Sequence, residues 1–264
     1  MTSYLTTNDG CQIAYQYEEK GDRPTLVLSI SLGTSMAMWQ PQLLEFNKHF
    51  NVLSYDMRGH GQSDVMAGGY SIDRLGCDLI ELLDHLNLGQ VLFCGLSIGG
   101  MLGQWLSVVH PNRVKALVLA NTSANAGPSS VWDTRLALIK KDGLPSLWPM
   151  VRDRWVSDEF ASQTPIEVQR LKEMFDGMTE QGYVGACAAV RDMDLRNVAQ
   201  LNTLPTLIIA GEKDVASPVE KSEYLLEQCQ NAELVLLDAG HLSNIECSDL
   251  FNKAVLDFLE EFKV

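Results

Sequence analysis

The stretch that decides the fold is Phe93-Cys-Gly-Leu-Ser97-Ile-Gly-Gly100. It joins an apolar strand expected over residues 91–94 to a helix expected over Gly99–Val109. Gly-x-Ser-x-Gly between a strand and a helix is the nucleophile-elbow pattern, in which small residues permit a tight turn that exposes the serine. Free N–H groups at the start of the helix favour negative charge beside Ser97. A glycine-rich turn with an incidental serine is the alternative, so the rest of the chain must decide.

Strands and helices alternate on both sides of this turn. Further strands are expected at Gln12–Glu18, Thr25–Ser31, Asn51–Tyr55, Val114–Ala120, Thr206–Ala210 and Leu234–Leu237. Further helices are expected at residues 72–86, Pro218–Gln228 and Ile245–Phe262. The alternation predicts an α/β fold with a mostly parallel, doubly wound sheet.

The alternation is interrupted between residues 125 and 201, where helical segments carry three of the five tryptophans. We interpret residues 125–201 as an inserted helical cap over the edge of the sheet where ligands bind in such folds. Residues 1–124 and 202–264 then form the core of the fold.

The composition limits the range of partners. The chain has 264 residues, of which 46% are hydrophobic, and a formal net charge of −14. Such a chain can bury a large core, and its charge argues against nucleic acid and anionic membrane surfaces as partners. A small anionic substrate would approach against this field, so it would need arginines placed locally in a pocket. The composition is compatible with a homo-oligomer.

Several other classes of site lack their sequence signals. The six cysteines are scattered without CxxC spacing, which is typical of reduced, mostly buried thiols. There is no HExxH motif or His/Cys cluster, and the elbow is neither a P-loop nor a dinucleotide loop, so we expect no metal and no cofactor. No signal peptide and no apolar run of about 18 residues is visible, which favours a cytoplasmic protein.

A serine hydroxyl needs a base, and that base needs an acid to fix its tautomer. Asp214 and His241 each follow a predicted strand, so both are expected at the same sheet edge as Ser97. Asp214 could also be a turn aspartate, and Glu212 is a rival acid that lies closer to the strand end. His60 is the rival base, which we assign to a loop scaffold.

An acyl-transfer site also needs two N–H groups that face the developing oxyanion. Ile98 follows the serine directly, and its N–H is the first candidate. Leu32, in the loop after the Thr25–Ser31 strand, supplies the second candidate N–H, although that loop could be only a turn.

With these residues in place, the chain resembles the α/β-hydrolase family. The resemblance narrows to the 3-oxoadipate enol-lactone hydrolases and covers nearly the whole chain. It is carried by Gly95-Leu-Ser-Ile-Gly-Gly-Met101, Ala116-Leu-Val-Leu-Ala-Asn-Thr122, residues 182–196 and His241-Leu-Ser-Asn-Ile-Glu246. One departure is Ile30, which stands where the family pattern has asparagine before Ser-Leu-Gly.

The resemblance implies a serine hydrolase that opens 3-oxoadipate enol-lactone to 3-oxoadipate in the catabolism of aromatic compounds. Its substrate carboxylate would need cations, for which Arg135 and Arg191 are the candidates, with Trp132 as an apolar wall. Arg154 and Arg196 compete for that role. Another small-ester or lactone hydrolase of the same fold, or a non-catalytic ligand-binding homologue, is the alternative.

Overall fold

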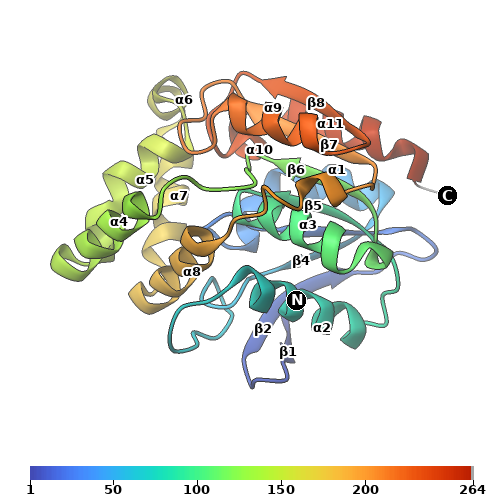
Figure 1. The fold of residues 1–264 in the computed structure, drawn as a ribbon, viewed down its shortest axis with the longest axis horizontal. Coiled ribbons are helices and arrows are strands. Elements are labelled where there is room, and N and C mark those ends of the chain that lie inside the picture. The colour runs from blue at the N-terminus through green and yellow to red at the C-terminus, as the bar shows by residue number, and fades with distance from the viewer. Residues whose placement is uncertain (263–264) are drawn as a thin grey trace.

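A single eight-stranded sheet organises the computed structural model, which describes residues 1–262 (Figure 1). Across the sheet the strands lie in the order β1-β2-β4-β3-β5-β6-β7-β8. Their bounds are β1 Ser3–Thr6, β2 Gln12–Glu18, β3 Thr25–Ser29, β4 Asn51–Tyr55, β5 Val91–Leu96, β6 Val114–Ala120, β7 Thr206–Gly211 and β8 Ala232–Leu237. β1 and β2 are antiparallel to their neighbours, and all other pairs are parallel. The predicted α/β fold with a mostly parallel sheet is confirmed.

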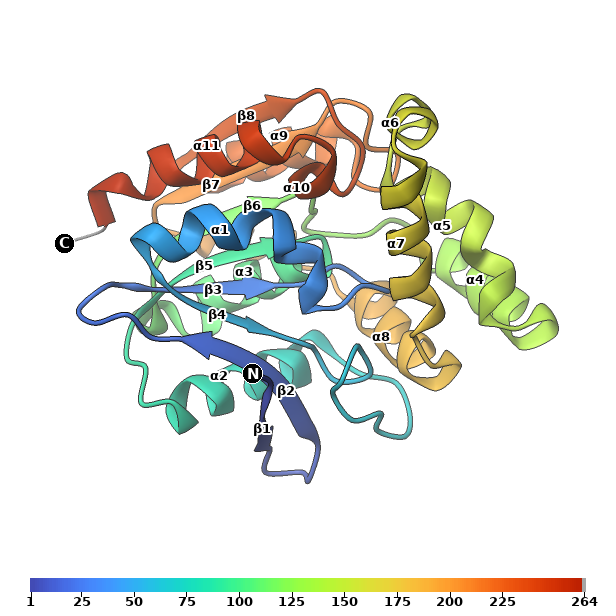
Figure 2. The same ribbon diagram turned by 180° about the vertical axis from the view of Figure 1, so that it is seen from behind.

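Helices cover both faces of the sheet. Helices α2, α3 and α9 lie in front of it in Figure 1, and α1, α10 and α11 lie in front in Figure 2, which is seen from behind. Their bounds are α1 Gln40–His49, α2 Ile72–His85, α3 Ile98–Val109, α9 Val219–Gln228, α10 Ser243–Glu246 and α11 Ser248–Leu259. Because both faces are covered, every residue of β3, β4, β5 and β7 is buried.

Five further helices stand between β6 and β7 in the chain and lie together at one end of the sheet (Figures 1 and 2). We call them the cap helices. They are α4 Ser129–Asp142, α5 Trp148–Trp155, α6 Asp158–Gln163, α7 Pro165–Asp176 and α8 Glu180–Asp192. The division into a core of residues 1–124 and 202–264 and a cap of residues 125–201 stays a prediction.

Two elements differ from expectation. Strand β1 was not predicted, because its four residues are mostly exposed and carry no apolar alternation. The closing helix expected over 245–262 is interrupted at Cys247 between α10 and α11, and a short 3-10 turn at Glu260–Phe262 follows α11.

None of the helices in the described part of the chain is both long and apolar enough to cross a membrane.

Candidate active site

Ser97 sits on a strained turn between β5 and α3. Its backbone angles are φ 58° and ψ −115°, a conformation that residues with a side chain rarely adopt. A Cβ on Gly95 would lie 2.2 Å from the carbonyl oxygen of Gly99, and one on Gly99 would lie 2.4 Å from that of Ser29. The elbow therefore requires glycine at both positions, because chain segments pass there in contact.

Neighbouring strands hold the strained serine in place. Its N–H donates to the carbonyl oxygen of Ala120 at 2.9 Å, and the Thr122 hydroxyl donates to its carbonyl oxygen at 2.7 Å. Strand β6 and the turn after it thus fix the backbone on both sides of the Ser97 side chain, which lines a cavity.

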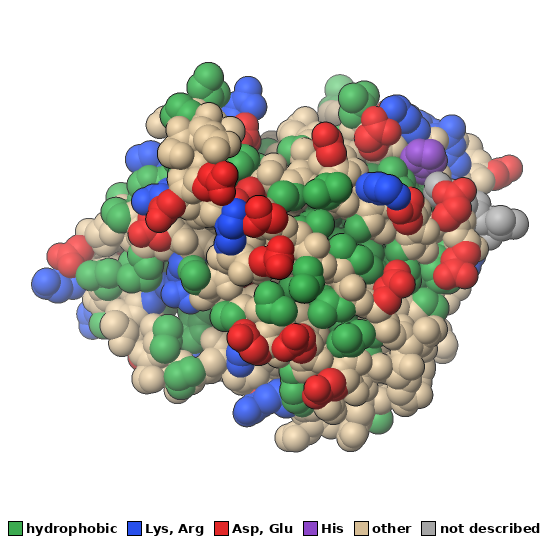
Figure 3. Space-filling model, turned by 90° about the horizontal axis from the view of Figure 1, so that it is seen from above, with side chains coloured by type: hydrophobic (Ala, Val, Ile, Leu, Met, Phe, Trp, Pro, Cys, Tyr) green, Lys and Arg blue, Asp and Glu red, His purple; other side chains and the backbone are tan. Residues whose placement is uncertain are grey.

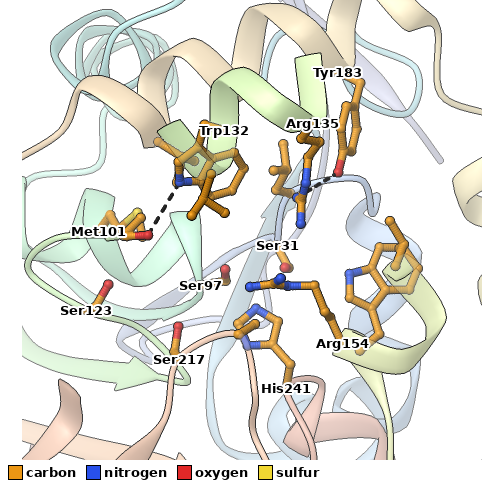
Figure 4. Close-up of a pocket in the computed structure, with 17 residues that line it drawn as sticks. Ser31, Ser97, Met101, Ser123, Trp132, Arg135, Arg154, Tyr183, Ser217 and His241 are labelled. Atoms are coloured by element: carbon orange, nitrogen blue, oxygen red, sulfur yellow. Dashed lines mark hydrogen bonds between the residues drawn. The ribbon is translucent and has the colours of Figure 1, made fainter. Parts of the chain in front are cut away.

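His241 and Asp214 are brought together from separate loops. The ring Nδ1 of His241 lies 2.8 Å from Oδ2 of Asp214, and both residues are buried. An ionised carboxylate only accepts hydrogen bonds, so Nδ1 carries the proton and Nε2 is left as the free ring nitrogen. His241 and Ser97 line the same cavity (Figure 4), and no hydrogen bond joins them within residues 1–262.

The Asp214 carboxylate receives a full set of donors. Oδ1 accepts from the backbone N–H groups of Ala216 and Ser217 at 2.7 and 2.9 Å, and Oδ2 accepts from the Asn121 side-chain amide at 3.0 Å. Burial works to raise the pKa of Asp214, but the charge of His241 and these hydrogen bonds outweigh it, so the pKa is lowered. The carboxylate is therefore ionised at neutral pH.

Asn121 is a site residue that the sequence analysis missed. It is fully buried with φ 46°, and its amide donates to the Gly240 carbonyl oxygen at 3.2 Å as well as to Asp214. Its oxygen accepts from the Ser243 hydroxyl. Asn121 follows β6 directly, so the strand-end signal that identified Asp214 and His241 could have found it.

The two N–H groups expected at an oxyanion site come from two separate segments of the chain. Ile98 is the first residue of α3, and Leu32 lies in the loop that follows β3 and lines the cavity. Neither N–H donates to an acceptor in the part of the chain that the structure describes. The next N–H, that of Gly33, donates to Nε2 of His60 at 3.2 Å.

His60 connects the loop after β3 to the loop after β4. Its Nε2 accepts from Gly33, so Nδ1 is the nitrogen that donates, to the Arg58 carbonyl oxygen at 3.2 Å. Burial lowers the pKa of His60 to about 4, which keeps the ring neutral. These contacts agree with the assignment of His60 to the scaffold.

The cavity of about 70 Å³ lies between the strand ends and the cap helices (Figure 4). Ser97 and His241 contribute from the sheet side, and Trp132, Arg135 and Arg154 contribute from α4 and α5.

Two guanidinium groups face this cavity. Arg135 is buried, stacks 4.7 Å from the Trp132 ring centre and donates to the Tyr183 hydroxyl at 3.1 Å. Arg154 is partly buried, and no carboxylate pairs with it or with Arg135 among residues 1–262. Burial and the charge of Arg135 lower the pKa of Arg154, with partial compensation from Tyr183 and Asp214. Two cations that line one cavity without a counterion can together pair with an anion.

This local charge opposes the charge of the whole chain. The formal net charge is −14, and Figure 3 shows Asp and Glu side chains spread over the face seen from above. Arg135 and Arg154 therefore give the cavity a positive local charge in a protein whose net charge is negative.

Arg191 does not reach the cavity, which corrects its expected place beside the substrate. Its guanidinium is held at the surface by Asp192, with N–O distances of 2.6 and 2.9 Å, and by Asp133 at 3.3 Å. Arg196 is likewise paired with Asp194, at 2.6 Å. Both arginines have nearby acidic partners in the sequence, whereas the cavity position belongs to Arg154.

The cavity also presents three hydroxyls that the sequence analysis did not single out. Ser31, Ser123 and Ser217 line it, and all three residues are buried.

Among residues 1–262, no group of three or more His, Cys, Asp or Glu side chains is arranged to hold a metal ion, and all six cysteines are free thiols.

Comparisons with known proteins agree with this architecture. The family model described as the alpha/beta hydrolase fold matches residues 24–192. A 3-oxoadipate enol-lactonase 2 from Acinetobacter baylyi is 38% identical over 98% of this chain and 96% of its own length. A protein with the name "Putative carbamate hydrolase RutD" from Stutzerimonas stutzeri is 32% identical over 91% of this chain and 93% of its own length.

A solved structure is similar over the same extent. The enol-lactonase from Burkholderia xenovorans superposes with a TM-score of 0.95 and 36% identity, over 98% of this chain and all of that one. The chain therefore belongs to the α/β-hydrolase fold family and is a hydrolase of the carboxylic-ester class.

Proposed function

We propose that this enzyme opens the ring of 3-oxoadipate enol-lactone, or of a close analogue that carries a carboxylate, to give 3-oxoadipate. The observation that carries the proposal is the unpaired Arg135 and Arg154 in the cavity of Ser97 and His241. A neutral ester gives these two cations no partner, whereas the carboxylate of the lactone's acetate arm can accept hydrogen bonds from both and offsets one of the two charges. The similarity to two enol-lactonases of Acinetobacter baylyi supports the same substrate.

In the first step, Ser97 Oγ attacks the lactone carbonyl carbon while Nε2 of His241 takes its proton. The tetrahedral oxyanion accepts hydrogen bonds from the N–H groups of Leu32 and Ile98. Asp214 stabilises the imidazolium through Nδ1–H. Proton transfer requires the Ser97 hydroxyl within hydrogen-bond reach of Nε2, a contact that is often formed fully only in the complex with substrate.

The ring carbon–oxygen bond then breaks, and the leaving group is an enolate. His241 returns its proton to this oxygen, and the enol becomes a ketone. An acyl group now links Ser97 to the opened chain. Water attacks this ester with His241 as general base, the serine oxygen leaves with the returned proton, and the dicarboxylate product is released.

The substrate assignment is tested by comparing kcat/KM for the enol-lactone with kcat/KM for p-nitrophenyl acetate, which has no carboxylate. We expect the enol-lactone to be preferred by roughly 100-fold or more, the order of two charge-assisted contacts. Good turnover of the neutral ester without turnover of the lactone would instead indicate a general esterase of the same fold.

A carbamate is the second candidate substrate, because the RutD relative is 32% identical over most of the chain. Carbamate hydrolysis in the same assay, faster than lactone hydrolysis, would favour it.

A further inference from the structure

The loop that carries His241 is bound on both sides to one short segment of the cap. The N–H of Leu242 donates to the Trp155 carbonyl oxygen at 2.8 Å. The N–H of Gly240 donates to Oε2 of Glu246 at 3.0 Å, and the same oxygen accepts from the N–H of Ser157 at 3.0 Å. The residues before and after His241 are therefore both tied to the joint between α5 and α6.

Glu246 is the centre of this connection. Besides the two N–H groups, its Oε1 accepts from the Ser157 hydroxyl, which itself accepts from the N–H of Phe160 at 3.1 Å. One carboxylate thus receives three hydrogen bonds from two loops that are far apart in sequence. A carboxylate is suited to this task because it offers several acceptor sites and no donor.

The two loops are closely packed at this point. A Cβ on Gly240 would lie 3.0 Å from both the Ser157 nitrogen and the Val156 Cα, and 3.1 Å from Glu246 Oε2. The cap segment also contains Arg154 and Trp155, which line the cavity. A displacement of this segment by a ligand therefore moves the backbone beside His241 as well.

We propose that Glu246 is a positioning residue, which couples the α5–α6 joint of the cap to the imidazole of His241. It does not touch the cavity, and it acts through Gly240. Binding of an anion at Arg154 would fix the joint, and the Glu246 contacts would then hold His241 in its working position. This inference rests on the proposed role of His241 as general base.

The test compares Glu246→Ala with wild type in steady-state kinetics on two substrates, the enol-lactone and p-nitrophenyl acetate. We expect kcat to fall roughly 10- to 100-fold on both substrates, because a misplacement of a catalytic group by about 1 Å has this order of effect. KM should stay within about threefold, since no contact to the substrate is removed.

Two further variants separate positioning from simple tethering of the cap. Glu159→Ala is the matched control, because Glu159 also joins α6 to the sheet side, through Lys213 at 3.2 Å, but accepts no hydrogen bond from the residues beside His241 and reaches their loop only indirectly, through the pair of Lys213 with Asp238. It should keep wild-type kcat. Glu246→Gln retains one acceptor oxygen for Gly240, and it should recover a large part of kcat even if Glu246→Ala does not fold.

The result that would overturn the inference is unchanged kcat in a folded Glu246→Ala, or a loss in Glu159→Ala as large as in Glu246→Ala. Equal losses in Glu246→Gln and Glu246→Ala would also overturn it. Failure of the proposed function looks different, because the wild type would then hydrolyse p-nitrophenyl acetate but not the lactone, and the Glu246 comparison would still be read on the acetate.

Discussion

Replacement of Arg154 by methionine should weaken recognition of the substrate anion without damage to the chemistry. A hydrogen bond between a guanidinium and a carboxylate contributes about 1.5–3 kcal/mol, and partial exposure of Arg154 places it near the lower end. A loss of about 1.5–2 kcal/mol corresponds to a fall of roughly 10- to 30-fold in kcat/KM for the enol-lactone. For p-nitrophenyl acetate, which has no carboxylate, the change should stay within about threefold.

The same variant makes a second, independent prediction about stability. Burial and the neighbouring charge of Arg135 lower the pKa of Arg154, which means that the charged form of this side chain destabilises the folded protein. Arg154→Met should therefore unfold at the same temperature as wild type or slightly above it. Thermal unfolding followed by circular dichroism measures this directly.

Arg191→Met is the matched control, because Arg191 is paired with Asp192 and Asp133 outside the cavity. It should keep wild-type kcat/KM on both substrates. Equal losses on the lactone and the neutral ester in Arg154→Met would refute the anion-site reasoning, and so would a loss in Arg191→Met that matches that of Arg154→Met.

Three further predictions concern the triad, the elbow and the loop scaffold. Asp214→Asn should lower kcat by about 10³- to 10⁴-fold with little change in KM, because the amide no longer holds the required tautomer of His241. Gly99→Ala should lower the free energy of unfolding by about 3 kcal/mol, since the new methyl meets a carbonyl oxygen of β3, whereas Gly89→Ala, which meets nothing within 4 Å, should not. His60 has a pKa of about 4 in the folded protein against 6.5 when exposed, so as the pH falls the unfolded chain binds a proton before the folded chain does. The free energy of unfolding, measured by urea melts, should therefore fall by roughly 3 kcal/mol as the pH is lowered from 6.5 to 4. His60→Gln should flatten this dependence.

The core of the fold could be predicted because its signals are local. Buried strands such as β3 and β5 are short apolar runs, and α2 shows its apolar face at helical spacing after the cap residue Ser71. Strand β1 could not be predicted in this way, because its pairing with β2 provides its order and its own residues are mostly exposed.

The site residues also divide into those with a local sequence signal and those placed by packing. Ser97, Asp214 and His241 follow strands, and the sheet topology brings the ends of parallel strands to one edge. The choice between Arg154 and Arg191 depends on how the cap helices pack, because each arginine has an adjacent aspartate in the sequence, but Asp192 pairs with Arg191 whereas Asp153 pairs with Arg152. The link from Glu246 to Ser157 joins residues 89 positions apart, so only the packed structure reveals it.

The most direct test of the central claim is the turnover of Ser97→Ala on the enol-lactone, compared with that of Ser107→Ala. Ser107 lies on α3 outside the cavity and donates to the Gln104 carbonyl oxygen, so it controls for the loss of a buried hydroxyl on the same helix. We expect kcat/KM to fall by roughly 10⁴-fold or more in Ser97→Ala and to change little in Ser107→Ala. Wild-type turnover in a folded Ser97→Ala would contradict the account.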